Sequence, residues 1–116
     1  MSGEAAPSYE LCALTDIEDG GSAGFGIEVH DKKIGIMAIR QGDMVYTYLN
    51  SCPHIGTPLD FKPGQFLDIA REHILCSTHA ALFRIEDGHC ISGPCAGLGL
   101  KPVINEIVNG RIYLSL

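Results

Sequence analysis

The chain carries CPHIGTPL at residues 52–59 and CSTH at residues 76–79, and these two stretches contain its candidate metal ligands. Each pairs a thiol with an imidazole: Cys52 and His54 stand two residues apart, and Cys76 and His79 stand three apart. Twenty-one residues separate His54 from Cys76. If the two loops face each other, two sulfur and two imidazole ligands converge on one site. The sequence therefore predicts a metal centre held between two loops.

Two kinds of centre accept two cysteines and two histidines. Zinc takes them as one tetrahedral ion. A Rieske-type [2Fe–2S] cluster divides them, with both cysteines on one iron and both histidines on the other. Zinc fingers usually supply a cysteine pair and then a histidine pair, whereas each loop here supplies one of each. Order and spacing favour the cluster; zinc, and thiols that are merely buried, remain the alternatives.

Short apolar runs separated by turn residues lie on both sides of these loops. The chain has fourteen glycines and six prolines in 116 residues, which indicates many tight turns and short strands. Asn109-Gly110 is a strong type I′ hairpin signal. The pattern around residues 68–72 hints at a single helical turn. We expect strands at residues 9–14, 24–29, 34–39, 44–49, 73–76, 82–86, 102–108 and 111–116.

These strands predict a single all-β domain over residues 1–116. Its base is expected to be an antiparallel β-sandwich or barrel. The middle of the chain, from about residue 50 to residue 98, is rich in turn residues and holds four of the five cysteines. Strands flank this stretch on both sides. We expect it to be a loop-rich cluster-binding subdomain inserted in the base.

Charge and composition exclude some partners. The formal charge of −6 argues against nucleic acid or an anionic membrane, which require clustered basic residues. The first ten residues lack the pattern of a signal peptide, and no window approaches 18 consecutive apolar residues. Five cysteines is an odd number, and two of them stand in metal-ligand spacings, which favours a reducing compartment over a disulfide scaffold. We expect a cytoplasmic protein with no membrane contact.

The ligand motifs resemble the two loops of Rieske ferredoxins of the oxygenase-associated type. That family carries C-x-H and C-x-x-H, with a glycine and a Pro-Leu pair soon after the first histidine. Ser92-Gly93-Pro94 resembles its third loop, whose proline covers the cluster. The resemblance runs from about residue 50 to residue 94 and implies one [2Fe–2S] cluster bound by Cys52, His54, Cys76 and His79. The residues it places next to the cluster are Gly56, Pro58, Leu59, Ala81, Phe83 and Pro94.

The chain departs from the family pattern at several positions. The gap between the ligand loops is long, with extra residues around 62–72. Ala80 stands where the family usually has glycine after the second histidine. Neither loop carries the additional cysteine of the respiratory members. Ala81 and Phe83 stand where those members have a serine and a tyrosine that donate hydrogen bonds toward the cluster sulfurs. The missing hydroxyls predict a low potential within the Rieske range of about −150 to +300 mV.

The resemblance implies a soluble one-electron carrier rather than a catalyst. Its donor would be a flavin-dependent ferredoxin reductase, and its acceptor a terminal oxygenase or a similar enzyme. A redox sensor, or a small subunit bound within a larger oxidoreductase, is the alternative function.

Several remaining side chains have ordinary structural interpretations. Cys12 is expected in the core, and Cys90 and Cys95 as buried thiols, with a disulfide between them left open. Met44, Tyr46 and Tyr48 alternate along one strand, which indicates core or half-buried positions. Surface or strand-edge positions are expected for His30, His73, His89, Asp60 and Asp68.

Overall fold

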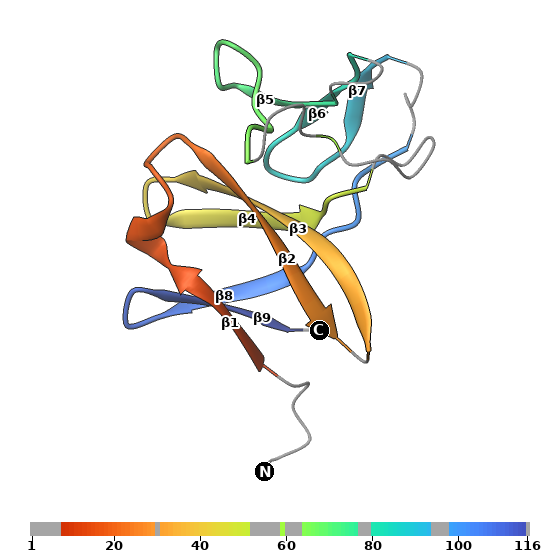
Figure 1. Ribbon diagram of the computed structural model, residues 1–116. Helices are drawn as coiled ribbons and strands as arrows, with labels where there is room; N and C mark the ends of the chain where they lie inside the picture. The colour runs from red at the N-terminus through yellow and green to blue at the C-terminus, as the bar shows by residue number, and fades with distance from the viewer. Residues whose placement is uncertain are drawn as a thin grey trace.

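The computed structural model describes residues 8–29, 31–51, 59, 64–76, 80–93 and 98–115. The described strands form three antiparallel sheets of three strands each (Figure 1). The sheet of β5, β6 and β7 lies at one end of the molecule, and β1, β8 and β9 lie at the other, with β2, β3 and β4 between them. We call the two lower sheets the base.

The first base sheet has the order β1-β9-β8. Its strands are β1 (Ser8–Ala13), β8 (Ile104–Val108) and β9 (Arg111–Ser115). A short 3₁₀ helix, η1 (Leu14–Asp16), follows β1 and was not predicted from the sequence. Asn109 and Gly110 join β8 to β9 with φ of 51° and 76°. These two positive values are those of a type I′ turn, so the hairpin prediction is confirmed.

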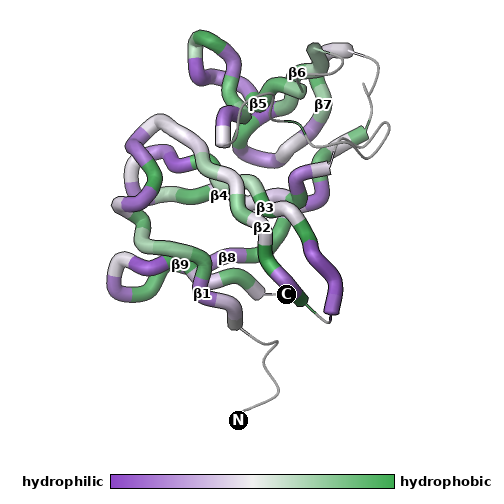
Figure 2. The backbone as a smooth tube through the Cα atoms, viewed as in Figure 1, coloured by the Kyte–Doolittle hydropathy of each residue, from purple (hydrophilic) through white to green (hydrophobic). Residues whose placement is uncertain are grey.

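The second base sheet consists of β2 (Ser22–Val29), β3 (Lys32–Gln41) and β4 (Met44–Leu49) in that order. Each pair is antiparallel, and both of the strands expected at residues 34–39 and 44–49 belong to this sheet. The β2–β3 end carries a hydrophilic stretch, visible in Figure 2, in which Lys32 and Lys33 are exposed. Met44 is 58% exposed, so its predicted half-buried position is wrong. It directly follows the exposed turn at Gly42-Asp43, at the end of the hairpin.

The third sheet has the order β5-β6-β7. Its strands are β5 (His73–Leu75), β6 (Leu82–Arg84) and β7 (Cys90–Ser92). The sequence analysis missed β7, and it extended β6 to residue 86, where residues 85–87 instead form a turn. In sequence this sheet falls between β4 and β8.

β3 is buried on both faces, because residues 36–39 are all buried. Side chains alternate along a strand. Ile36 and Ala38 therefore pack into the base, while Met37 and Ile39 pack toward the β5–β7 sheet. We call the second set the upper core; its buried members are Met37, Ile39, Tyr48, Leu59, Phe66, Ile74, Cys76, Ala81, Phe83, Ile85, Cys90 and Leu100.

Hydrogen bonds close the base and connect it to the upper sheet. The Thr47 hydroxyl donates to the Val103 carbonyl at 2.6 Å and accepts from the Asn105 amide at 2.9 Å, which joins β4 to β8. On the other side, the Ser22 hydroxyl donates to the Gly64 carbonyl at 2.7 Å. No helix within the described ranges is long and apolar enough to cross a membrane.

Candidate metal centre

The second ligand loop is the turn of the β5–β6 hairpin. Leu75 pairs with Leu82, and the Cys76 amide donates to the Ala81 carbonyl at 2.9 Å. These contacts close the loop immediately around the CSTH motif. Cys76, the predicted ligand at the start of this motif, is fully buried. His79, the other predicted ligand of this loop, lies outside the described residues.

Ala80 has a left-handed backbone conformation, with φ of 54°. The resemblance places a glycine here, and the structure shows why glycine suits the position. An alanine in this region is disfavoured because its Cβ crowds the backbone. Ala80 is exposed, so packing does not compensate for the strain. Ala80 therefore holds a backbone conformation that glycine would adopt more easily.

The first ligand loop follows β4 directly. Leu59, at its end, is fully buried in the upper core. The Leu59 amide donates to Oδ1 of Asn50 at 2.8 Å, so the two ends of the loop meet. The other predicted residues of this loop, Cys52, His54, Gly56 and Pro58, lie outside the described residues. Asn50 is a residue that the sequence analysis did not single out; an asparagine just before a turn-rich motif was the available signal.

The third loop begins after β7 and contacts the second. Gly93 has φ of 104°, and a Cβ placed on it would lie 2.8 Å from Cα of Ala81. The two backbones therefore touch at a position where only glycine fits. Pro94 and Cys95 lie outside the described residues, so the covering role predicted for Pro94 and the question of a Cys90–Cys95 disulfide are not tested. Cys90 is buried, and its thiol donates to the Ser92 carbonyl at 3.4 Å.

One apolar core links the three loops. Leu59 ends the first loop, Cys76 and Ala81 bracket the second, and Cys90 lies in the strand before the third; all four belong to the upper core. The described parts of the loops thus converge, as a centre shared between them requires. A buried thiol in such a place fits an iron–sulfur cluster. Within the described ranges no three His, Cys, Asp or Glu side chains gather into a metal site, and three of the four predicted ligands lie outside those ranges.

The positions of Ala81 and Phe83 bear on the electronics of the site. Both side chains are fully buried, and neither has a hydroxyl group. Phe83 pairs with Ile74 on β5 and Cys90 on β7, at the centre of the upper sheet. Neither residue can donate a hydrogen bond through its side chain.

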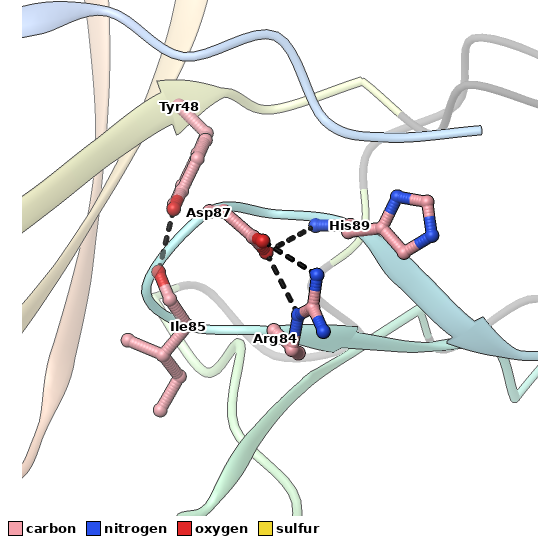
Figure 3. Close-up of polar contacts among 5 residues, drawn as sticks. All are labelled: Tyr48, Arg84, Ile85, Asp87 and His89. Carbon is pink, nitrogen blue, oxygen red and sulfur yellow. Dashed lines mark hydrogen bonds and ion pairs between the residues drawn. The ribbon is translucent and has the colours of Figure 1, made fainter. Parts of the chain in front are cut away.

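A tyrosine from the base anchors the β6–β7 turn (Figure 3). The Tyr48 hydroxyl donates to the Ile85 carbonyl at 2.5 Å. Burial raises the pKa of Tyr48, and the nearby carboxylates of Asp87 and Glu86 add to the effect. Its ring also fills the space beside Gly88, where a Cβ would lie 2.8 Å from Cε1. Tyr48 was expected in the core, and it is only 2% exposed.

The same turn carries an ion pair on its outer side. Arg84 donates to both carboxylate oxygens of Asp87, at 3.1 and 2.6 Å, and Asp87 also accepts the His89 amide at 2.9 Å (Figure 3). The Arg84 hydrogen bonds lower the pKa of Asp87. His89 is exposed, as expected from the sequence. These contacts hold the turn, and the charged side chains are half exposed to solvent.

Asp68 and His73 form a second polar pair, before the ligand hairpin. Asp68 accepts the amides of Glu72 and His73 at 2.9 and 3.2 Å, and its other oxygen lies 3.2 Å from Nδ1 of His73. Burial acts to raise the pKa of Asp68, but these hydrogen bonds outweigh it and the pKa is lowered. The Asp68 side chain is 22% exposed, so its assignment to solvated surface was wrong. His30 and Asp60 lie outside the described residues.

The suggested helical turn at residues 68–72 is a tight turn instead. The Arg71 amide donates to the Asp68 carbonyl at 2.9 Å, and Arg71 has φ of 58°. A left-handed residue ends any helix, so the hint from the sequence was wrong. Ile69, at the tip, is fully exposed, and Figure 2 shows hydrophobic residues at this tip.

The family model of the Rieske [2Fe–2S] domain matches residues 8–103. The chain belongs to this family. Membership means that its cofactor is one Rieske-type [2Fe–2S] cluster, and the all-β architecture and recognised resemblance are confirmed. None of the curated protein sequences matches the chain.

Solved structures of low sequence identity share the Rieske fold of this chain. One is the ferredoxin of carbazole 1,9a-dioxygenase from Nocardioides aromaticivorans IC177, with 21% identity, a TM-score of 0.69, and coverage of 92% of this chain and 97% of that one. Another comes from a complex of reduced oxygenase and oxidized ferredoxin in carbazole 1,9a-dioxygenase, with 21% identity, a TM-score of 0.72 and coverage of 93% and 92%. The terminal oxygenase of carbazole 1,9a-dioxygenase from Novosphingobium sp. KA1 matches at 16% identity and a TM-score of 0.74; 97% of this chain covers 30% of it.

Proposed function

We propose that this Rieske protein is a one-electron carrier whose cluster is held by Cys52 and Cys76 on one iron and by His54 and His79 on the other. The observation that carries the proposal is the convergence of the three loops on the upper core, with Cys76 fully buried at the ligand hairpin. When bound, the cluster accepts and releases one electron. The protein keeps water from the thiolate side through the buried residues around Cys76.

Residues 50–98 are proposed as the cluster-binding subdomain. The β5–β7 sheet and the three loops fall in this range, and the base strands precede and follow it. Gly56, Pro58, Leu59, Ala81, Phe83 and Pro94 are proposed to surround the cluster. In this arrangement the base supplies a rigid platform, because β3 is packed on both faces.

The proposed circuit runs from a flavin-dependent ferredoxin reductase to a terminal oxygenase or a similar enzyme. Structures with the same fold include a ferredoxin in complex with its oxygenase, which makes such an acceptor the first one to test. The thiol ligands and the odd number of cysteines fit a reducing cytoplasm better than an oxidising compartment.

The proposed potential is low for a Rieske centre. Ala81 and Phe83 are buried and lack hydroxyl groups, so they cannot stabilise the reduced cluster by donating to its sulfurs. We expect a midpoint below roughly +100 mV, within the lower part of the Rieske range. A redox titration followed by visible circular dichroism measures it. A midpoint well above that value would contradict this part of the proposal.

The test of the cluster assignment is electron paramagnetic resonance of the dithionite-reduced protein, with iron and acid-labile sulfide analysis. Two irons and two sulfides per chain, and the rhombic signal with low average g that histidine ligation produces, support the proposal. One zinc and no iron would overturn it. A matched pair of variants tests the ligands: Cys76→Ser should lose the cluster, whereas Cys12→Ser, a buried cysteine of the base, should retain it.

A further inference from the structure

The first ligand loop is closed by a side chain, and this distinguishes it from the second. A backbone hydrogen bond from Cys76 to Ala81 closes the second loop within a regular hairpin. The ends of the first loop, by contrast, meet through Oδ1 of Asn50, which accepts the Leu59 amide at 2.8 Å. The two partners are nine positions apart, and the span between them contains Cys52 and His54.

Asn50 is itself fixed to the base. The backbone N–H of Asn50 donates to the Gly35 carbonyl on β3 at 2.8 Å, and the backbone N–H of Ser51 donates to the Leu49 carbonyl at 2.9 Å. Asn50 packs closely on Gly35, since a Cβ added there would lie 3.3 Å from Cβ of Asn50. The backbone at the start of the loop is therefore fixed by its own hydrogen bonds, independently of the hydrogen bond that the Asn50 side chain makes.

Leu59 is equally fixed at the other end. Its side chain is fully buried in the upper core, together with Cys76 and Ala81 of the second loop. The hydrogen bond from Leu59 to Asn50 thus connects the base, the first loop and the packing around the second loop. Opening it would release one end of the segment that carries two ligands while leaving the other two ligands in place.

We propose that Asn50 is a positioning residue for the metal centre. Its side-chain oxygen holds the first loop closed, so that Cys52 and His54 stay aligned with the ligands of the second loop. This inference rests on the proposed function, because it takes those four residues as the ligands. This role requires a side-chain oxygen that accepts the Leu59 amide hydrogen bond. Aspartate at position 50 should therefore preserve the function of Asn50, whereas alanine should not.

The test compares three variants: Asn50→Ala, Asn50→Asp and Asn105→Ala. Asn105 is the matched control, because it is a partly buried asparagine whose amide donates to Val45 and Thr47 in the base, away from the ligand loops. The first measurement is the rate at which an iron chelator bleaches the visible spectrum. The second is hydrogen exchange of the peptide containing Leu59. The third is unfolding by urea.

Asn50→Ala should accelerate cluster loss by about five-fold, the factor typical of one lost hydrogen bond, and should speed exchange at Leu59. Asn50→Asp should keep both rates near those of the unchanged protein and lower the midpoint potential, since it adds negative charge near the centre. Asn105→Ala should weaken resistance to urea without accelerating cluster loss to the same extent.

Equal acceleration by Asn50→Ala and Asn105→Ala would reduce Asn50 to a general contributor to stability and overturn the inference. An unchanged rate of cluster loss in Asn50→Ala would do the same. If the unchanged protein holds one zinc and no iron, the proposed function fails on its own. The same comparison, made on zinc release to a chelator, then still decides whether Asn50 holds the first loop.

Discussion

At the scale of single residues, the chain shows strain at the ligand loop and tight polar contacts around it. Ala80 adopts a positive φ that glycine would adopt at lower cost. The Tyr48 hydroxyl donates a hydrogen bond to a carbonyl of the β6–β7 turn. The sequence indicated both residues, the first as a departure from the family pattern and the second as a core position. Neither the backbone angle nor the hydroxyl partner could be derived from sequence, because both depend on which segments meet.

Replacing Ala80 with glycine should stabilise the protein by about 0.5–1 kcal/mol. The substitution removes the strain of a left-handed alanine, and the gain is reduced by the greater backbone entropy of glycine in the unfolded chain. Urea unfolding of the cluster-loaded protein measures it. Ala70→Gly is the control: Ala70 is also exposed, but its φ is not positive, so glycine there should be neutral or destabilising. Destabilisation by Ala80→Gly would contradict the argument.

Replacing Tyr48 with phenylalanine should cost about 1–2 kcal/mol of stability at neutral pH, because the Ile85 carbonyl loses a buried partner. The pKa of Tyr48 is raised, so the unfolded chain loses this proton first as the pH increases. The contribution is complete below the ordinary tyrosine pKa of about 10 and is lost above it. The substitution should therefore also weaken the decline of stability at alkaline pH.

Urea unfolding at pH 8 and at pH 11 follows both effects. Tyr46→Phe is the control on the same strand, since no hydrogen bond of its hydroxyl is seen within the described ranges. If Tyr48→Phe and Tyr46→Phe had the same alkaline profile, the role assigned to the Tyr48 hydroxyl would be wrong.

At the scale of elements, the ligand hairpin and the loop after β7 form one unit. The sequence predicted most strands within two residues, because their apolar runs and turn residues are local signals. It missed β7, which is only Cys90–Ser92. This strand exists because Cys90 pairs with Phe83 on one side and its amide donates to the Leu98 carbonyl on the other. Both partners lie outside the strand, seven and eight positions from Cys90, so no pattern within residues 90–92 marks it.

Replacing Gly93 with alanine should push the third loop away from the ligand hairpin. The new Cβ would meet Cα of Ala81 at 2.8 Å, and φ of 104° is strained for any residue with a side chain. We expect a loss of at least about 1–2 kcal/mol in stability, with broadened lines in the paramagnetic resonance spectrum.

Gly42→Ala separates steric contact from backbone strain. Gly42 also has positive φ, at 64°, but a Cβ there would contact nothing within 4 Å. It should cost stability without altering the spectrum. Identical spectra for Gly93→Ala and the unchanged protein would show that the contact with Ala81 does not reach the centre.

At the scale of the whole molecule, the chain carries a formal net charge of −6. A charged carrier is attracted to a partner of opposite sign over distances near the Debye length of about 10 Å at 0.1 M salt. The rate of reduction by a reductase with a basic docking face should therefore fall several-fold as salt is raised from about 0.05 M to 0.5 M.

Reduction by dithionite provides the control for this prediction. Dithionite is an anion, so screening should leave its rate unchanged or increase it. Stopped-flow absorbance follows both reactions. A reductase rate that does not depend on salt would show that docking relies on apolar contacts instead.

The sequence alone determined the kind of cofactor, the all-β class and most strand positions. Ligand chemistry depends on residue type and order, and strand patterns depend on alternation over a few residues, so both are local. Only the tertiary structure decided how the loops are closed: the Asn50–Leu59 bond, the contact of Gly93 with Ala81, and the Tyr48–Ile85 bond. The first links the two ends of one loop, the second links two loops, and the third links the base to the β6–β7 turn. Such contacts form because burial in the upper core brings the segments together, and no stretch of sequence records that meeting by itself.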